Sequence, residues 1–285
     1  MFISIITINR NNKDGLKKTM QSVLDQDFDD FEYIVVDGAS DDGSVEIIQE
    51  YEEQFKQQNR IAFQYESKPD KGIFHAMNKG IVKARGKYLL FLNSGDYLVE
   101  AKVLTSFAQY RLEEDFVTGD IKINIDGHNE IRKNPEKVDF LFFYSVGAFH
   151  HQATFIKKTV FDNFGMYNED NKICSDWEHS LRSIVVGGAS YIHIELTVSY
   201  FDISGVSSNE ALRSLSAEEQ RRVFLSLMPE YVLDTLNYYR EKEQIGKTKQ
   251  KLYDEYLMIK NGKMGFVINW ILGIKKVRRK IFRGI

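Results

Sequence analysis

Residues 67–96 read SKPDKGIFHAMNKGIVKARGKYLLFLNSGD, and this stretch decides the fold class. The apolar residues of 73–84 recur with a helical period, and Gly86 ends that pattern. An uninterrupted apolar run follows at 88–92, which is too short for a helix and typical of a parallel strand covered on both faces. An acidic turn, a helix, a buried strand and a terminal carboxylate, Asp96, therefore follow one another directly.

Two further strands that end in polar residues precede this stretch. FISIITINRN (2–11) is apolar until its polar end, and FEYIVVDGASDDGS (31–44) closes in a carboxylate turn. An amphipathic helix, LKKTMQSVLDQDF (16–28), lies between them. The alternation predicts an α/β fold with a mostly parallel, Rossmann-like sheet flanked by helices, and such sheets bind ligands at the carboxyl ends of their strands.

The polar groups at these strand ends suit a nucleotide that carries a diphosphate. A carboxylate at Asp96 can hold a divalent cation that bridges two phosphates, although taken alone it can equally be a solvated turn acid. A carboxylate at Asp37 or Asp70 can accept hydrogen bonds from a base N–H or from ribose hydroxyls. We therefore expect a nucleotide site at this edge of the sheet.

Seven segments, taken in order, resemble the family 2 glycosyltransferases with the GT-A fold. They are SIITINRN, SVLDQDF, EYIVVDGASDDGS, KPDKGIFHAMNKGI, ARGKYLLFLNSGD, HQATFIKKTVFDNFG and ICSDWEHSLR. The resemblance implies an inverting, surface-polysaccharide type of enzyme with a GT-A catalytic domain at 1–208. Its nucleotide-binding half would be 1–100, and its acceptor and catalytic half 101–208.

The resemblance also implies a role for each matching acid. Asp37 and Asp70 match the positions that hold uracil and ribose, and Asp96 matches the ligand of Mn²⁺ or Mg²⁺ on the diphosphate. Asp176, in SDWE, matches the general base. The other nucleotide-binding candidates are Thr7, Asn9, Asn78 and Ser94. The candidates for the donor and acceptor pocket are His151, Gln152, Trp177 and Glu178.

Two residues depart from the family's pattern. Asn93 stands where the metal motif usually begins with Asp, so Asp96 would act with phosphate oxygens and water and would bind a cation weakly. His75 stands where the subfamily commonly has an acid, and it is either a surface histidine or a ligand contact. The first departure motivates an alternative function, a catalytically inactive nucleotide-sugar-binding or scaffold protein.

The second half of the domain supplies the acceptor side in this interpretation. FVTGDIKINIDGHNEIR (116–132) predicts a hairpin whose turn residues are Asp126 and Gly127. SDWEHSLRSIV predicts a helix with Ser175 as its N-cap, which places Asp176 in the first turn and directs Glu178 elsewhere. The resemblance further implies that residues 202–208 close over the donor, and the alternatives are an ordinary loop and a linker to the C-terminal helices.

A helical extension and a basic tail follow the domain. Residues 209–260 predict two helices separated by Pro229, whose apolar faces could pack on the domain or on a second copy of the chain. Residues 260–285 hold eight Lys or Arg and no acid, so the net charge of −3 for the whole chain leaves −11 for the rest. The tail, 261–285, has apolar residues before its basic cluster.

This composition suits contact with an anionic membrane surface through 262–285, and a helix docked on the domain is the alternative. The excess of basic charge is confined to the tail, which lacks interleaved stacking aromatic residues, so we expect no nucleic-acid partner. A single cysteine, Cys174, excludes an internal disulfide and suits a reducing cytosol. No apolar run is long enough to span a membrane, and the start lacks the basic residues of a signal peptide.

The sequence therefore predicts a cytoplasmic enzyme, peripheral at the inner face of the membrane. Its expected partners are a nucleotide-sugar donor and a glycan or lipid-linked acceptor. A nucleotidyltransferase is the remaining alternative, but ITINRNNKDG does not resemble the basic glycine-rich loop that such an enzyme needs for a triphosphate.

Truncation after Asn261 should release the protein from anionic liposomes, because it removes Trp270 and seven of the eight basic residues at 260–285. Co-sedimentation with phosphatidylserine vesicles at moderate salt measures the effect. Equal binding by the full and truncated chains would favour the docked helix.

Overall fold

The computed structural model describes residues 1–145, 147–202 and 212–244. The chain divides into two compact units, one of residues 1–138 with 147–216 and one of residues 139–146 with 217–285. The first unit contains the whole sheet and all predicted site residues. Residues 203–208 of the expected loop at 202–208, and the basic tail at 261–285, lie outside the described residues.

The first half of the sheet is parallel. β1 (Ile3–Asn9) pairs with β2 (Phe31–Asp37) and with β4 (Tyr88–Phe91), and β2 pairs with β3 (Ala62–Ser67). β1, β2 and β4 are buried along their whole length, as expected of strands with both faces covered. The predicted α/β class with a parallel core is confirmed.

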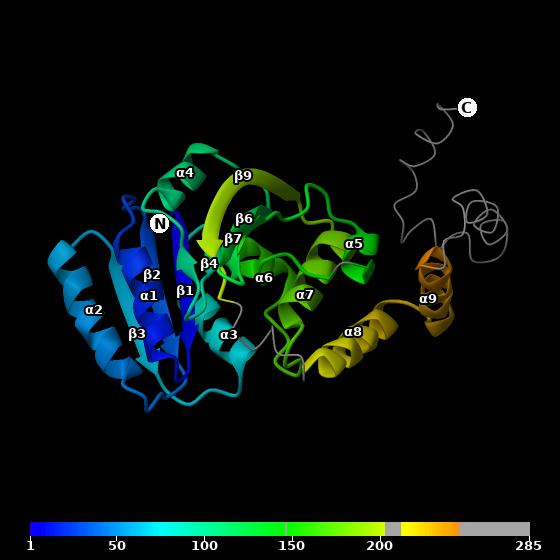
Figure 1. The fold of residues 1–285 in the computed structure, drawn as a ribbon, viewed down its shortest axis with the longest axis horizontal. Coiled ribbons are helices and arrows are strands. Elements are labelled where there is room, and N and C mark those ends of the chain that lie inside the picture. The colour runs from blue at the N-terminus through cyan, green and yellow to red at the C-terminus, as the bar shows by residue number, and fades with distance from the viewer. Residues whose placement is uncertain (146, 203–211, 245–285) are drawn as a thin grey trace. The chain divides into compact units, whose positions relative to one another are not determined.

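Helices cover both faces of this parallel half (Figure 1). α1 (Lys13–Leu24) and α2 (Ser44–Gln58) bury their apolar stripes in one core with side chains from β1 and β2. α3 (Ile73–Lys83) packs on β1 and β2 through Gly80, where an added Cβ would lie 2.4 Å from Cγ2 of Ile6. The close approach of α3 therefore needs glycine at this position.

The second half of the sheet is mixed. β4 pairs antiparallel with β8 (Thr154–Lys157), β8 pairs antiparallel with β6 (Phe116–Ile125), and β6 pairs parallel with β9 (Tyr191–Tyr200). β5 (Tyr97–Leu98) closes the order β3-β2-β1-β4-β8-β6-β9-β5. All antiparallel pairs among the described strands lie in this half of the sheet. Most of its strands belong to residues 101–208, the range that the sequence analysis expects to form the acceptor and catalytic half.

The predicted hairpin is confirmed. β6 and β7 (His128–Arg132) pair antiparallel around a two-residue turn. Asp126 and Gly127 both have positive φ, at 51° and 84°, as a type I′ turn requires.

Short helices surround the mixed half: α4 (Val103–Gln109), η1 (His151–Ala153), α6 (Lys158–Phe164), α7 (Ser175–Ser180) and the π-helical η2 (Leu181–Val186). The expected N-cap of α7 was wrong by one residue. Cys174 is the cap, because its carbonyl accepts the first helical hydrogen bond from the Glu178 N–H at 2.8 Å. Asp176 still lies in the first turn.

The second unit contains α5 (Phe140–Ser145), most of α8 (Arg213–Leu227) and α9 (Glu230–Gln244). Phe224 of α8 packs against the rings of Phe140 and Tyr144 at centroid distances of 5.5 and 5.8 Å. α8 and α9 are separate helices with Pro229 between them, as predicted. The described residues contain no helix whose length and hydropathy would let it span a bilayer.

Candidate functional site

The predicted nucleotide-binding residues lie at one edge of the parallel sheet. Asn9 is level with Asp37 across the β1–β2 pair, and Asp37 is level with Ser67 across the β2–β3 pair. The Ser94 N–H bonds to the Ile8 carbonyl at 3.1 Å, so the turn after β4 reaches the same edge. The parallel register therefore brings together polar groups from the ends of three strands and from the turn after a fourth.

The carboxylate of Asp37 is buried and fully hydrogen-bonded. It accepts from the Asn9 amide at 2.8 Å, from the Ser40 hydroxyl and N–H at 2.6 and 2.9 Å, and from the Ser67 hydroxyl at 2.6 Å. Burial raises the pKa of Asp37, but these donors outweigh burial and hold the pKa below its ordinary value. Asp37 is thus an ionised carboxylate that ties together the ends of β1, β2 and β3.

Two other predicted nucleotide-binding residues also bond within the fold. Thr7 is fully buried, and its hydroxyl accepts from the Tyr33 hydroxyl at 3.0 Å and donates to the Leu92 carbonyl at 2.7 Å. The Asn78 amide donates to the Tyr167 carbonyl at 2.9 Å and accepts from the Tyr167 N–H at 3.1 Å. These bonds give Thr7 and Asn78 a structural role, since they join β1 to β4 and α3 to the segment before α7.

Asp70, Ser94 and His75 lie around the same edge. Asp70 accepts from the Gly72 N–H at 3.0 Å. Oδ2 of Asp70 would lie 2.6 Å from a Cβ added to Gly38. The carboxylate of Asp70 therefore lies beside the end of β2. Ser94 is held by the Asn12 amide, which donates to its carbonyl at 2.9 Å. His75 accepts from the Lys71 N–H at 3.2 Å, within the first turn of α3.

Asp96, the predicted metal ligand, is 5% exposed. Its Oδ1 accepts from the Asp202 N–H at 2.9 Å, and its carbonyl accepts from the Thr19 hydroxyl at 2.6 Å. Burial raises the pKa of Asp96 to about 7, although the charge of His151 and the Asp202 N–H oppose the rise. A carboxylate that is this costly to ionise gains most from a nearby cation.

The residues around Asp96 fit a hard divalent cation. Asp202 Oδ2 lies over Gly95, whose φ is +107° and whose added Cβ would be 2.8 Å from that oxygen. Two carboxylates are therefore near each other, and oxygen ligands suit Mg²⁺ and Mn²⁺. The described residues contain no group of three His, Cys, Asp or Glu that could hold a metal, so diphosphate oxygens and water would have to complete the shell.

Sequence reasoning missed Asp202 as a site residue. It appeared only as the first residue of the expected loop at 202–208, and a lone acid after a strand gives no signal of its partner. Only the packing of β9 beside the turn after β4 shows that Asp202 meets Asp96.

Asp176, the predicted general base, is held from two sides. Its Oδ1 accepts from the Trp177 N–H at 2.9 Å, and its Oδ2 lies 3.5 Å from Nδ1 of His151. Burial lowers the pKa of His151, but the carboxylates of Asp176 and, less strongly, Asp96 outweigh it and raise that pKa. His151 is therefore near both Asp176 and Asp96, which lie 80 positions apart in the sequence.

The remaining pocket candidates differ in their surroundings. Gln152 and Trp177 are buried, at 1% and 2% exposure. Glu178 accepts from the amides of Asn168 and Asn171 at 3.1 and 2.5 Å, so its carboxylate holds the preceding loop. Glu178 therefore does not share the surroundings of Asp176, although the two are only two residues apart.

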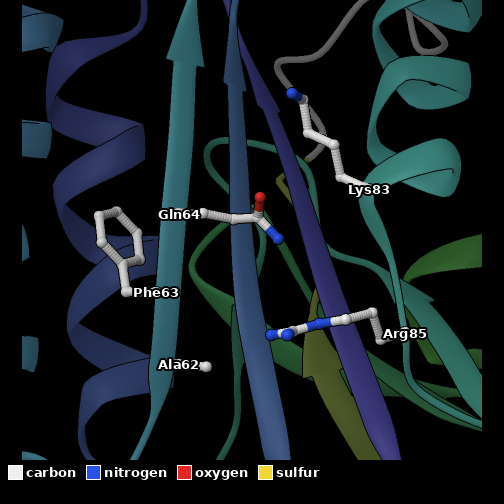
Figure 2. A pocket seen from close by; sticks show the side chains of 5 residues that line it. All are labelled: Ala62, Phe63, Gln64, Lys83 and Arg85. Carbon is white, nitrogen blue, oxygen red and sulfur yellow. The ribbon is translucent and has the colours of Figure 1, made fainter.

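A surface pocket on β3 lies away from this site (Figure 2). Gln64, Lys83 and Arg85 line it on one side of β3, and Phe63 points to the other side. It lies toward the amino end of β3, because Ala62 is level with Glu32 at the start of β2. Its cations are already paired: Arg85 with Glu32 at 2.9 Å and Lys83 with Glu66 at 3.4 Å.

The model of the family described as Glycosyl transferase family 2 matches residues 4–168. The chain belongs to this family. The glycosyltransferase is 29% identical to the PGL/p-HBAD biosynthesis glycosyltransferase of Mycobacterium tuberculosis over 210 residues, which cover 72% of this chain and 78% of that protein. It is 34% identical to the putative teichuronic acid biosynthesis glycosyltransferase TuaG of Bacillus subtilis over 122 residues, or 39% of this chain and 47% of TuaG.

Solved structures show the same fold. S. aureus TarS 1–349, solved with UDP, has a TM-score of 0.56 at 20% identity, with 70% of this chain and 60% of that chain covered. The mannosyltransferase PcManGT of Pyrobaculum calidifontis, solved with GDP-Man and Mn²⁺, has a TM-score of 0.59 at 17% identity, with 79% and 63% covered. The glycosyltransferase thus spans less than two thirds of either solved chain. The predicted GT-A fold is confirmed.

The raised pKa of Asp96 predicts how Asp96→Asn affects stability. Because the folded-state pKa of about 7 lies above the ordinary value, the folded protein binds more protons than the unfolded chain between about pH 4 and 7, and its stability falls as the pH rises through this window. Asp96→Asn should therefore stabilise the metal-free protein at pH 8, by on the order of 2–4 kcal/mol. At pH 4 the two proteins should be nearly equal in urea unfolding.

The same variant should lose stabilisation by Mn²⁺ with UDP at pH 8. The control is UDP alone, which should stabilise both proteins to a similar degree. Equal stabilisation of the variant by Mn²⁺ with UDP would exclude Asp96 as the metal ligand.

Proposed function

We propose that this glycosyltransferase transfers a sugar from a UDP-sugar to a hydroxyl of a glycan or lipid-linked acceptor, with inversion, during synthesis of a surface polysaccharide or glycolipid. The observation that carries the proposal is that His151 contacts Asp176 and is close enough to Asp96 for their charges to interact. Its Nδ1 faces Asp176 at 3.5 Å, and its charge interacts with Asp96. Asp96, which would hold the cation, and Asp176, which would take the proton, therefore both interact with the same imidazole.

The names of similar proteins support the choice of substrates. TarS has been solved with UDP and with UDP-GlcNAc, which favours a UDP-sugar, whereas PcManGT has been solved with GDP-Man. The relatives from M. tuberculosis and B. subtilis are named for the biosynthesis of PGL/p-HBAD and of teichuronic acid. A lipid-linked acceptor would also agree with the membrane contact predicted for 262–285.

Each part of the reaction needs a group that the site contains. Asp96 would hold Mg²⁺ or Mn²⁺, and the cation would neutralise the diphosphate as it leaves. Asp176 would take the proton of the acceptor hydroxyl while the oxygen bonds to the anomeric carbon. The bond from that carbon to the diphosphate breaks in the same step, so UDP leaves. Because attack comes from the face opposite the diphosphate, the anomeric centre inverts.

The nucleoside would lie across the ends of β2 and β3. Asp70 lies beside the end of β2 and is our candidate for the ribose hydroxyls. Asp37 already accepts four hydrogen bonds, so we propose that it shapes the base site by fixing the turns around it. Its contact with uracil, implied by the family resemblance, would require one of these donors to move.

The donor is tested by a thermal-shift comparison of UDP-, GDP-, dTDP- and CMP-sugars, each with and without Mn²⁺. UDP-sugars should raise the melting temperature most, and the full rise should need Mn²⁺. A ligand at 100 times its Kd adds about 2.7 kcal/mol to the free energy of unfolding, which such a comparison detects. Stabilisation by GDP-sugars alone would overturn the choice of UDP.

Asp176→Asn should abolish most of the transfer while leaving donor binding intact. The amide keeps the shape and the bond to the Trp177 N–H but has no basic lone pair, so kcat should fall by roughly 10²- to 10⁴-fold. The measurement is UDP release from the donor that the thermal-shift comparison selects, with calorimetry for donor affinity.

The matched variant is Glu178→Gln, which changes a neighbouring carboxylate that bonds to Asn168 and Asn171 and should cost far less. Near wild-type turnover of Asp176→Asn would remove Asp176 as the base. A wild-type protein that binds the donor but never releases UDP would support the inactive, sugar-nucleotide-binding alternative.

A further inference from the structure

The residue that departs from the family's metal motif, Asn93, contacts a histidine. Its Nδ2 lies 3.2 Å from Nε2 of His151, and the other ring nitrogen of His151, Nδ1, lies 3.5 Å from Oδ2 of Asp176. Asn93 follows β4, His151 begins η1 and Asp176 lies in α7. A continuous line of side chains therefore joins the turn of the metal site to the proposed general base.

With the amide nitrogen of Asn93 toward the ring, one tautomer of a neutral His151 is favoured. An amide nitrogen only donates, so the Nε2 that faces it must be the acceptor and Nδ1 must carry the proton. That proton then points at Asp176, whose ionised carboxylate accepts hydrogen bonds and cannot donate them. The pair thus presents a hydrogen-bond donor to Asp176, the carboxylate proposed to take the proton from the hydroxyl of the sugar-acceptor molecule.

Asn93 can serve the charged ring as well. Its Oδ1 is buried and has no hydrogen-bond partner, and a half-turn of the amide would place this oxygen opposite Nε2. An imidazolium, which donates from both nitrogens, would then satisfy Oδ1. A carboxylate at this position could accept but not donate, so it would favour either the charged ring or the neutral tautomer whose proton is on Nε2, and in that tautomer Nδ1 has no proton to donate to Asp176. The departure from Asp therefore has a physical consequence at Asp176.

We propose that Asn93 and His151 form a positioning pair that orients the carboxylate of Asp176 for proton transfer. The inference rests on the proposed function, in which Asp176 is the base. His151 fixes Oδ2 and the Trp177 N–H fixes Oδ1, so the carboxylate is held from both sides. A separation of 3.5 Å is long for a hydrogen bond, and such contacts commonly shorten when the substrate binds.

The accessibility of the pair supports this role. The side chains of His151 and Asp176 are 22% and 23% exposed, so both are partly shielded from water and Asp176 can still be reached by an acceptor hydroxyl. Asp176 also raises the pKa of His151, as expected for a ring that faces an ionised carboxylate. A direct metal ligand is the alternative role for His151, and it predicts a loss of cation affinity.

The first test replaces His151 by Ala and by Asn in the full chain. His151→Ala should lower kcat for UDP release by roughly 10- to 100-fold, the worth of a hydrogen bond to a charged group, while KM and the affinity for Mn²⁺ with UDP stay within about twofold. His151→Asn should recover most of that loss, because its Nδ2 can take the place of Nδ1. His128→Asn, on the exposed strand β7, is the matched control and should leave kcat unchanged.

The second test is Asn93→Asp, which restores the family's residue. If Asn93 positions His151, the new carboxylate should bind the ring of His151 as an imidazolium and pull that ring away from Asp176. The value of kcat at pH 7 should then fall, although Mn²⁺ should bind at least as tightly. If Asn93 is only a weakened part of the metal motif, kcat and Mn²⁺ affinity should rise together. A rise of both would overturn the positioning pair.

The outcomes separate this inference from the proposed function. Loss of transfer in Asp176→Asn with wild-type kcat in His151→Ala would reject the positioning pair and keep the function. A loss of Mn²⁺ affinity in His151→Ala would reject it in favour of the metal ligand. Thermal unfolding of every variant identifies one that fails to fold, and in that case His151→Asn and Asn93→Asp decide the question.

Discussion

The parallel pairing of β1 with β2 on one side and β4 on the other is the constraint on which the whole site depends. Parallel strands end at the same edge, so the turns after β1, β2 and β4 must present Asn9, Asp37 and Ser94 together. The mixed half of the sheet adds its own groups from the other direction. β8 runs antiparallel to β4, and η1 immediately before it therefore brings His151 to the end of β4.

The second requirement of the fold is to stabilise negative charge at this edge. Asp37 meets it with four donors from the protein and has a lowered pKa, whereas Asp96 accepts few hydrogen bonds, is buried and has a pKa of about 7. The negative charge of Asp37 is therefore stabilised by donors within the protein. The negative charge of Asp96 would need a cation from outside the protein. This difference distinguishes a carboxylate that is stabilised within the fold from one that a divalent cation could stabilise.

The position of Asp176 depends on contacts that reach across the glycosyltransferase. Asn78 of α3 binds the backbone of Tyr167, and the loop that follows is held by Glu178 through two asparagine amides. These bonds fix the start of α7, and the Trp177 N–H and His151 then fix the carboxylate itself. Asn78 and Glu178 thus contribute to the position of Asp176, the proposed base.

The sequence by itself determined the strands, the helices between them and the polar residues at their ends, because burial, periodicity and turn chemistry are local properties. Through its resemblance to the family, the sequence also singled out Asp96 and Asp176 as candidate site residues. It could not show that Thr7 and Asn78 bond internally, that Asn93 meets His151 58 positions away, or that Asp202 meets Asp96 at a separation of 106. Only tertiary structure decided these partners, because a hydrogen bond acts over about 3 Å and its atoms come together only when distant strands pack.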